Sequence, residues 1–120
     1  MPEAKDIVER YLASFNETDG QARQDLLESL YEDDSTYTDP LVDLTGPREI
    51  DAFIATTQEQ FPGFAFSLSG PIDAHHNQMR FQWKAGPAED DPMVIGFDVI
   101  VMRNGRIGSV HGFHDKVPAA

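Results

Sequence analysis

The sequence predicts an α+β fold in which three helices precede a curved antiparallel sheet that wraps around them as a cone. Two observations support this fold. Apolar residues recur at helical spacing as far as residue 61 and alternate with polar residues after residue 63. Turn signals separate the alternating segments, and the clearest of them is Asn104-Gly105. Because 120 residues is an ordinary domain length, we expect one domain over residues 1–120.

Three N-terminal segments each carry an apolar stripe, as amphipathic helices do. The stripe of the first helix consists of Ile7, Val8, Tyr11, Leu12 and Phe15. That of the second consists of Ala22, Leu26, Leu27 and Leu30, with Tyr31 at its end. The third helix follows a capping Thr45, has Pro47 in its first turn and buries Ile50, Phe53, Ile54, Thr57 and Phe61.

The other segments are rich in alternating or β-branched residues, which predicts strands. A short strand spans residues 35–39, and Pro40 keeps Asp39 extended. Four strands joined by turns then cover residues 64–68, 78–85, 93–102 and 107–114. The strand 93–102 is apolar at nearly every position, so we expect both of its faces to be covered. One face would line the cone and a second subunit would cover the other, which predicts a homodimer through the sheet.

The composition excludes several classes of function. Nine Lys and Arg against 21 Asp and Glu give a net charge of −12, which argues against binding to nucleic acids or to anionic membranes. No apolar run is long enough to span a bilayer and the N-terminus is polar, so we expect a cytoplasmic protein. The sequence has no cysteine and no metal or cofactor motif. We expect His75-His76-Asn77 to form a surface turn and Glu89-Asp90-Asp91 a solvated loop.

Three polar residues stand within or beside apolar patterns and are candidates for function. Asp98 lies in the middle of the apolar strand 93–102, where an ionised carboxylate needs a partner or a proton. Tyr11 lies on the apolar stripe of the first helix, where its hydroxyl needs a hydrogen-bond partner. Asp39 ends a strand beside Pro40. Each also has a structural interpretation: a hydrogen-bonded structural acid, a core tyrosine and a turn aspartate that bonds the local backbone.

Nearly the whole chain resembles the nuclear transport factor two superfamily, a cystatin-like fold that includes the SnoaL-like proteins and ketosteroid isomerase. The segments that carry the resemblance are Arg10–Asn16, Tyr31–Pro40, Gly46–Ile50, Gly96-Phe97-Asp98 and the Asn104-Gly105 hairpin. The cone-shaped α+β fold of that superfamily agrees with the order of elements predicted above.

The resemblance to ketosteroid isomerase implies a role for each candidate. Asp39 matches the aspartate that acts as base, and Tyr11 and Asp98 match the two donors of the oxyanion hole. Asp98 would then carry a proton, and no cofactor would be needed. We expect the substrate pocket to include Tyr37, Phe53, Phe81, Trp83, Val110 and His114.

The function predicted from this resemblance is proton transfer next to the carbonyl group of a small apolar ligand, through an enolate. Two alternatives stay open. SnoaL-like relatives include polyketide cyclases, and other cones carry out hydrolysis or dehydration, with Asp39 or His114 as acid or base. A cone can also bind a ligand without chemistry, because fold does not imply activity.

Overall fold

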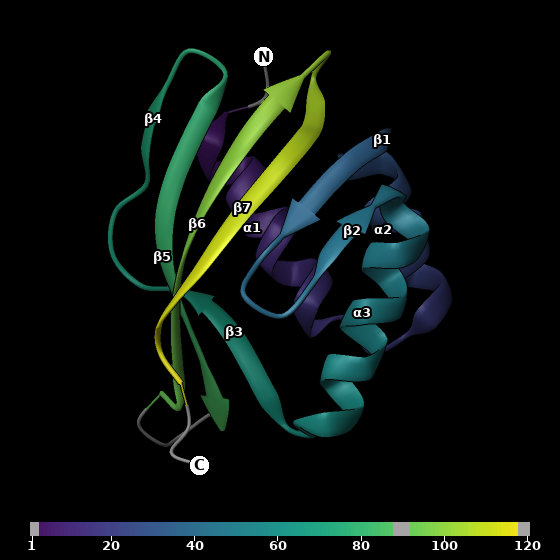
Figure 1. Ribbon diagram of the computed structural model, residues 1–120, viewed down its shortest axis with the longest axis vertical. Coiled ribbons are helices and arrows are strands. Elements are labelled where there is room, and N and C mark those ends of the chain that lie inside the picture. Colours follow the sequence, from purple (N-terminus) through teal and green to yellow (C-terminus); the bar gives the residue numbers. More distant parts are fainter. Residues whose placement is uncertain (1–2, 88–91, 118–120) are drawn as a thin grey trace.

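The computed structural model describes residues 3–87 and 92–117. The chain forms α1 (Ala4–Asn16), α2 (Gly20–Leu30), β1 (Tyr31–Thr38), β2 (Asp43–Thr45) and α3 (Gly46–Gln60). Five strands follow, namely β3 (Phe64–Leu68), β4 (Asp73–His75), β5 (Gln78–Pro87), β6 (Val94–Arg103) and β7 (Arg106–Lys116). The α+β fold is thereby confirmed, and the predicted elements occur in the expected order with the short strands β2 and β4 added to them (Figure 1). The predicted loop Glu89-Asp90-Asp91 lies outside the described residues.

The strands form one curved, unclosed sheet in the order β2-β1-β7-β6-β5-β3, and β4 pairs with β5. Neighbouring strands are antiparallel except at one place, because β1 lies parallel to β7. The sheet is therefore mixed, and the expectation of a wholly antiparallel sheet is wrong at this pairing. The physical reason is connectivity. No hairpin joins β1 to β7, so turn geometry does not force the two strands to run in opposite directions.

Local differences from the sequence prediction have simple causes. The second helix ends at Leu30, and Tyr31 has an extended backbone that begins β1. Continuing the helix through the acidic residues 32–34 would place negative charges at its negative end, which is unfavourable. Strands β2 and β4 have three residues each, too few to show an alternating pattern. His75 ends β4, and His76 has the positive φ of a tight turn.

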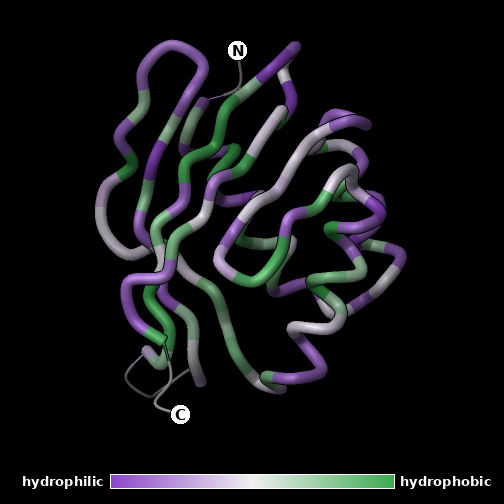
Figure 2. The backbone as a smooth tube through the Cα atoms, in the orientation of Figure 1, coloured by the Kyte–Doolittle hydropathy of each residue, from purple (hydrophilic) through white to green (hydrophobic). Residues whose placement is uncertain are grey.

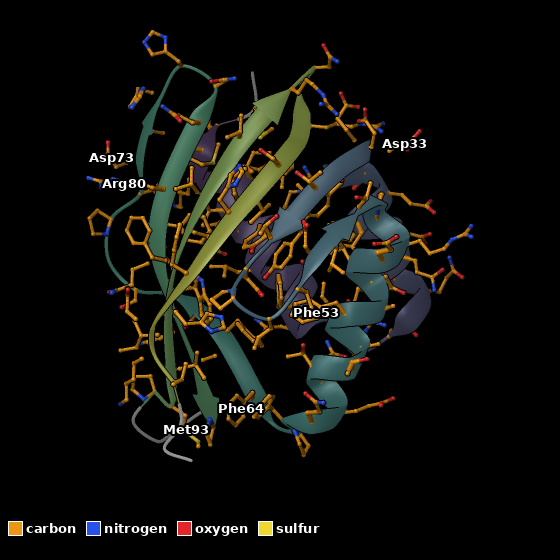
Figure 3. The ribbon with its side chains drawn as sticks, in the orientation of Figure 1. Asp33, Phe53, Phe64, Asp73, Arg80 and Met93 are labelled. Carbon is orange, nitrogen blue, oxygen red and sulfur yellow. The ribbon has the colours of Figure 1, made fainter. Side chains whose placement is uncertain are left out.

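All three helices lie on one side of the sheet, and the core fills the space between them (Figure 1). Strand β5 alternates as predicted, with four buried side chains facing the helices: Met79, Phe81, Trp83 and Ala85. Arg80 points outward and donates to Asp73 of β4 at 3.1 Å (Figure 3). Among the described residues, no helix is long and apolar enough to cross a membrane.

The outer face of β6 is less well covered than its inner face. Four of its outward side chains are apolar and only partly buried, namely Ile95, Phe97, Val99 and Val101, and Arg103 at the end of the strand is charged and exposed. Figure 2 shows the same strand as a largely hydrophobic stretch. Next to it on β7, Phe113 is 58% exposed. This chain therefore does not itself cover both faces of β6, and the homodimer stays a prediction.

We predict that a second copy of the chain packs on this outer face, because covering its apolar side chains removes them from water. Sedimentation equilibrium should then give twice the mass of the chain. Phe97→Glu should shift the protein to monomer, whereas Glu28→Gln on the exposed surface of α2 should not. A wild-type protein that sediments as a monomer at micromolar concentration would contradict the prediction.

Candidate active site

A cavity of about 280 Å³ opens between α1, α3 and the inner face of the sheet. At its rim, Leu41 and Val117 are 72% and 57% exposed. At its inner end, Tyr11 and Asp98 are only 1% and 3% exposed. Much of the wall is aromatic, and the rings that line it belong to Tyr11, Phe15, Tyr37, Phe53, Phe61, Phe64, Phe66 and Trp83. Phe53 and Phe64 lie between α3 and the strands in Figure 3.

Tyr11 and Asp98 form one hydrogen-bonded pair at the inner end of this cavity. The Tyr11 hydroxyl donates to Asp98 Oδ2 at 2.6 Å. Helical periodicity places Tyr11 on the buried face of α1, and the alternation of β6 turns Asp98 inward between the outward Phe97 and Val99. The sequence pattern identified both residues separately, and the fold brings them into contact over 87 positions of sequence.

Burial governs the protonation of Asp98. Desolvation raises its pKa from the ordinary value of 3.8 to about 6, although the hydrogen bond from Tyr11 favours the charged form and opposes this. The Trp83 indole also favours the charged form, while the Asp39 charge acts weakly in the other direction. Trp83 Nε1 has no hydrogen-bond partner of normal geometry within the described residues, so its effect on Asp98 is that of a nearby N–H dipole. Burial therefore moves the pKa of Asp98 toward neutral pH, in the direction that the expected proton requires, and a resident proton on Asp98 stays a prediction.

Asp39 is held by three donors at the wall of the cavity. Its Oδ1 accepts from the backbone N–H groups of Leu41 and Val42 at 2.8 and 3.1 Å. Its Oδ2 accepts from the Tyr37 hydroxyl at 3.0 Å. The two backbone bonds are those of the turn aspartate considered above, yet the same side chain also lines the cavity. The structural and functional interpretations of Asp39 are therefore compatible.

Two glycines make room for these side chains. Gly112 lies opposite Asp98 on β7, and a Cβ at that position would stand 2.9 Å from Asp98 Oδ1 and 3.2 Å from Asp39 Cβ. Gly96 lies opposite Trp83 on β5, and a Cβ there would overlap the indole ring at 2.1 Å. Any larger residue at either position would displace a cavity wall.

The predicted pocket residues fall into two groups. The first lines the cavity and consists of Tyr37, Phe53, Trp83 and His114, together with Tyr11, Asp39 and Asp98. Phe81 and Val110 are not among the lining residues. Phe81 packs edge-on against Tyr11 at 5.8 Å between ring centroids, behind the cavity. Val110 pairs with Ile100 one step further from the opening than Asp98, and both are fully buried in the core.

Twelve other described residues also line the cavity and were not predicted from the sequence as pocket residues. They are Leu12, Phe15, Leu41, Thr56, Thr57, Gln60, Phe61, Phe64, Phe66, Ala85, Val94 and Val117. Many of them were recognised as apolar positions of a helix or strand, but periodicity does not distinguish a cavity wall from a filled core. Within residues 3–87 and 92–117, no group of three His, Cys, Asp or Glu residues is arranged to hold a metal ion.

Tyr31 is a further polar residue near this site. It is fully buried at the start of β1, and its hydroxyl has no hydrogen-bond partner within the described residues. Burial and, less strongly, the charge of Asp98 raise the pKa of Tyr31 far above its usual range. The apolar pattern places Tyr31 at the end of the second helix, so it does not predict a buried hydroxyl at the start of a strand. A neutral tyrosine therefore adds a further dipole to the surroundings of Asp98.

Comparison with known proteins shows the family to which this chain belongs. Residues 8–110 match the SnoaL-like domain family. A SnoaL-like family protein from Agrobacterium tumefaciens str. C58, proposed to be an isomerase, is 36% identical, with a TM-score of 0.87 over 91% of this chain and 94% of that chain. The fold is shared with a proposed SnoaL-like polyketide cyclase from Jannaschia sp. CCS1, which is 18% identical, with a TM-score of 0.72 over 96% of this chain and 89% of that chain. It is also shared with a proposed ketosteroid isomerase from Kribbella flavida DSM 17836, which is 15% identical, with a TM-score of 0.69 over 95% of this chain and 78% of that chain. No curated protein matches the sequence.

The buried acid predicts a specific pH dependence of stability. Because folding raises the pKa of Asp98, its contribution to stability is fully present below the unfolded value near 3.8 and is lost as pH rises through about 6. Relative to Asp98→Asn, the wild-type free energy of unfolding should fall by roughly 2 kcal/mol between about pH 4 and pH 7. Urea denaturation of both proteins at several pH values measures this difference. A difference that stays constant with pH would show that Asp98 titrates normally.

Proposed function

Because this chain belongs to the SnoaL-like family, we propose that it catalyses proton transfer at the carbon next to the carbonyl group of a small, largely apolar ligand. One observation carries the proposal. The hydrogen-bonded Tyr11–Asp98 pair and the Asp39 carboxylate line the same apolar cavity. A base and a pair of oxyanion donors are the two components that an enolate-forming reaction requires.

Asp39 is the base in this proposal. It removes a proton from the carbon next to the carbonyl group and returns it to another carbon, so that a double bond shifts and no atom is gained or lost. The three hydrogen bonds from Tyr37, Leu41 and Val42 fix the direction in which the carboxylate points. A base that is already oriented needs no reorganisation as the proton moves.

Tyr11 and Asp98 stabilise the enolate oxygen. In the free protein the Tyr11 hydroxyl donates its hydrogen bond to Asp98. Since the pKa of Asp98 is already about 6, a developing negative charge beside it raises this pKa further and favours uptake of a proton. Once protonated, Asp98 no longer has to accept a hydrogen bond from Tyr11. The Tyr11 hydroxyl and the Asp98 carboxyl O–H can then both donate to the ligand oxygen. Exclusion of water from the apolar cavity strengthens such hydrogen bonds.

The size of the cavity bears on the substrate. Its volume of about 280 Å³ lies at the lower end of the range of about 300–1,000 Å³ that is usual for small-molecule sites. We therefore propose a small ketone, monocyclic or bicyclic, as the substrate class.

Ring closure of a polyketide is the second candidate reaction. An aldol-type cyclisation also passes through an enolate, and the same base and donors serve it. His114 favours this candidate, because it places a second group capable of acid–base chemistry in the cavity. A ketone that contains a second carbonyl within reach of its enolate carbon would distinguish cyclisation from isomerisation.

We predict that Asp39→Asn reduces the isomerisation of a β,γ-unsaturated cyclic ketone by roughly 10² to 10⁴-fold, the usual contribution of a positioned base. The affinity for the α,β-unsaturated product should change little, because Asn keeps the shape of the side chain. The assay follows the absorbance of the conjugated product. Asp33→Asn is the matched control, since Asp33 is an exposed acid on β1, the strand that precedes Asp39 (Figure 3). Unchanged turnover in Asp39→Asn would exclude Asp39 as the base.

A further inference from the structure

We propose that the same cavity also binds small alkylammonium ions, a class of ligand distinct from the carbonyl compounds considered above. The cavity combines a nearly continuous aromatic wall with two carboxylates. Among its described lining residues there is no lysine or arginine. Aromatic faces and carboxylates together are the groups that recognise alkylated ammonium ions.

The aromatic wall is a chain of neighbouring rings. Successive ring centroids are 5.6, 6.3, 5.2, 5.4 and 6.0 Å apart along the series Phe53, Tyr37, Phe15, Phe66, Trp83 and His114. The rings of this series belong to α3, β1, α1, β3, β5 and β7, so six different elements contribute aromatic side chains to the lining. The face of each benzene or indole ring carries partial negative charge, and a cation within about 6 Å of several faces is attracted by all of them.

The charges inside the cavity have the sign that a cation requires. Asp98 is nearly inaccessible to water and is hydrogen-bonded to Tyr11, which is neutral. Asp39 approaches it from the other side of Gly112. Two carboxylates so close together, without a cationic side chain in the described lining, leave negative charge uncompensated. A buried carboxylate is costly unless it is paired, and a bound ammonium ion would supply the missing partner.

The groups that face Asp98 determine how this binding depends on pH. They are Tyr11 from α1, Tyr31 and Tyr37 from β1, and Asp39 from the following loop. His114 of β7 lines the same cavity. The pKa of each of the three tyrosines is raised, so they stay neutral up to high pH. As pH falls, Asp98 takes up a proton and loses its charge, which weakens binding of an alkylammonium ion in acid.

An oxyanion mimic such as a phenol should show the opposite trend, because the proposed catalytic role requires protonated Asp98. The two proposals can therefore fail independently. Cation binding is measured without any turnover, and loss of isomerase activity does not affect its outcome.

The test compares choline with 3,3-dimethylbutan-1-ol, which has nearly the same shape but no charge. Binding is followed by the emission of Trp83, the single tryptophan of the sequence, and repeated by calorimetry. At about pH 8 choline should bind at least about tenfold more tightly than the neutral alcohol, a typical preference for a desolvated cation–π site. At about pH 5 this preference should shrink severalfold.

Variants separate the cavity from the general negative charge of the protein. Asp98→Asn and Asp39→Asn should each reduce the preference for choline at constant ionic strength, and Asp39→Asn provides the test if Asp98→Asn does not fold. Glu28→Gln removes one charge from the exposed surface of α2 and should leave the preference unchanged. Equal binding of the two ligands, or binding of neither, would overturn the proposal. The proposal would also be overturned if Glu28→Gln reduced the preference for choline as much as the two cavity variants do.

Discussion

The burial of Asp98 in the middle of β6 is the constraint on which the site depends. A carboxylate at 3% exposure needs donors, and Tyr11 of α1 supplies one at 2.6 Å. This bond joins the first helix to the central strand of the sheet. It also makes the inner end of the cavity polar while the wall stays aromatic. The position of α1 and the chemistry of the site are therefore determined by the same contact.

Two glycines of the sheet leave the space that the side chains of the site occupy. Gly96 allows the indole of Trp83 to lie across β6, and Gly112 leaves space between the carboxylates of Asp98 and Asp39. Filling either position would move a wall of the cavity. The site is therefore a consequence of register as much as of residue type, because a shift of one residue would turn Asp98 to the outer face.

The sequence was informative where a residue violated a strong pattern. Asp98 in an apolar strand and Tyr11 on an apolar helix stripe were recognisable before their contact was known, because burying a polar group demands a partner. Pairings between distant segments were not accessible in the same way. The parallel alignment of β1 with β7, the burial of Tyr31, and the position of Phe81 and Val110 behind the cavity all follow from tertiary packing. Periodicity identifies which face is buried but not whether that face meets a ligand or another side chain.

The proposed mechanism requires that ligand binding can protonate Asp98 at physiological pH. Carbon-detected NMR titration of the Asp98 side-chain carboxyl, with and without a phenol as the enolate mimic, tests this requirement. We expect a pKa of about 6 in the free protein and a higher value in the complex. An ordinary aspartate pKa in the free protein, or one that does not rise when the phenol binds, would contradict it.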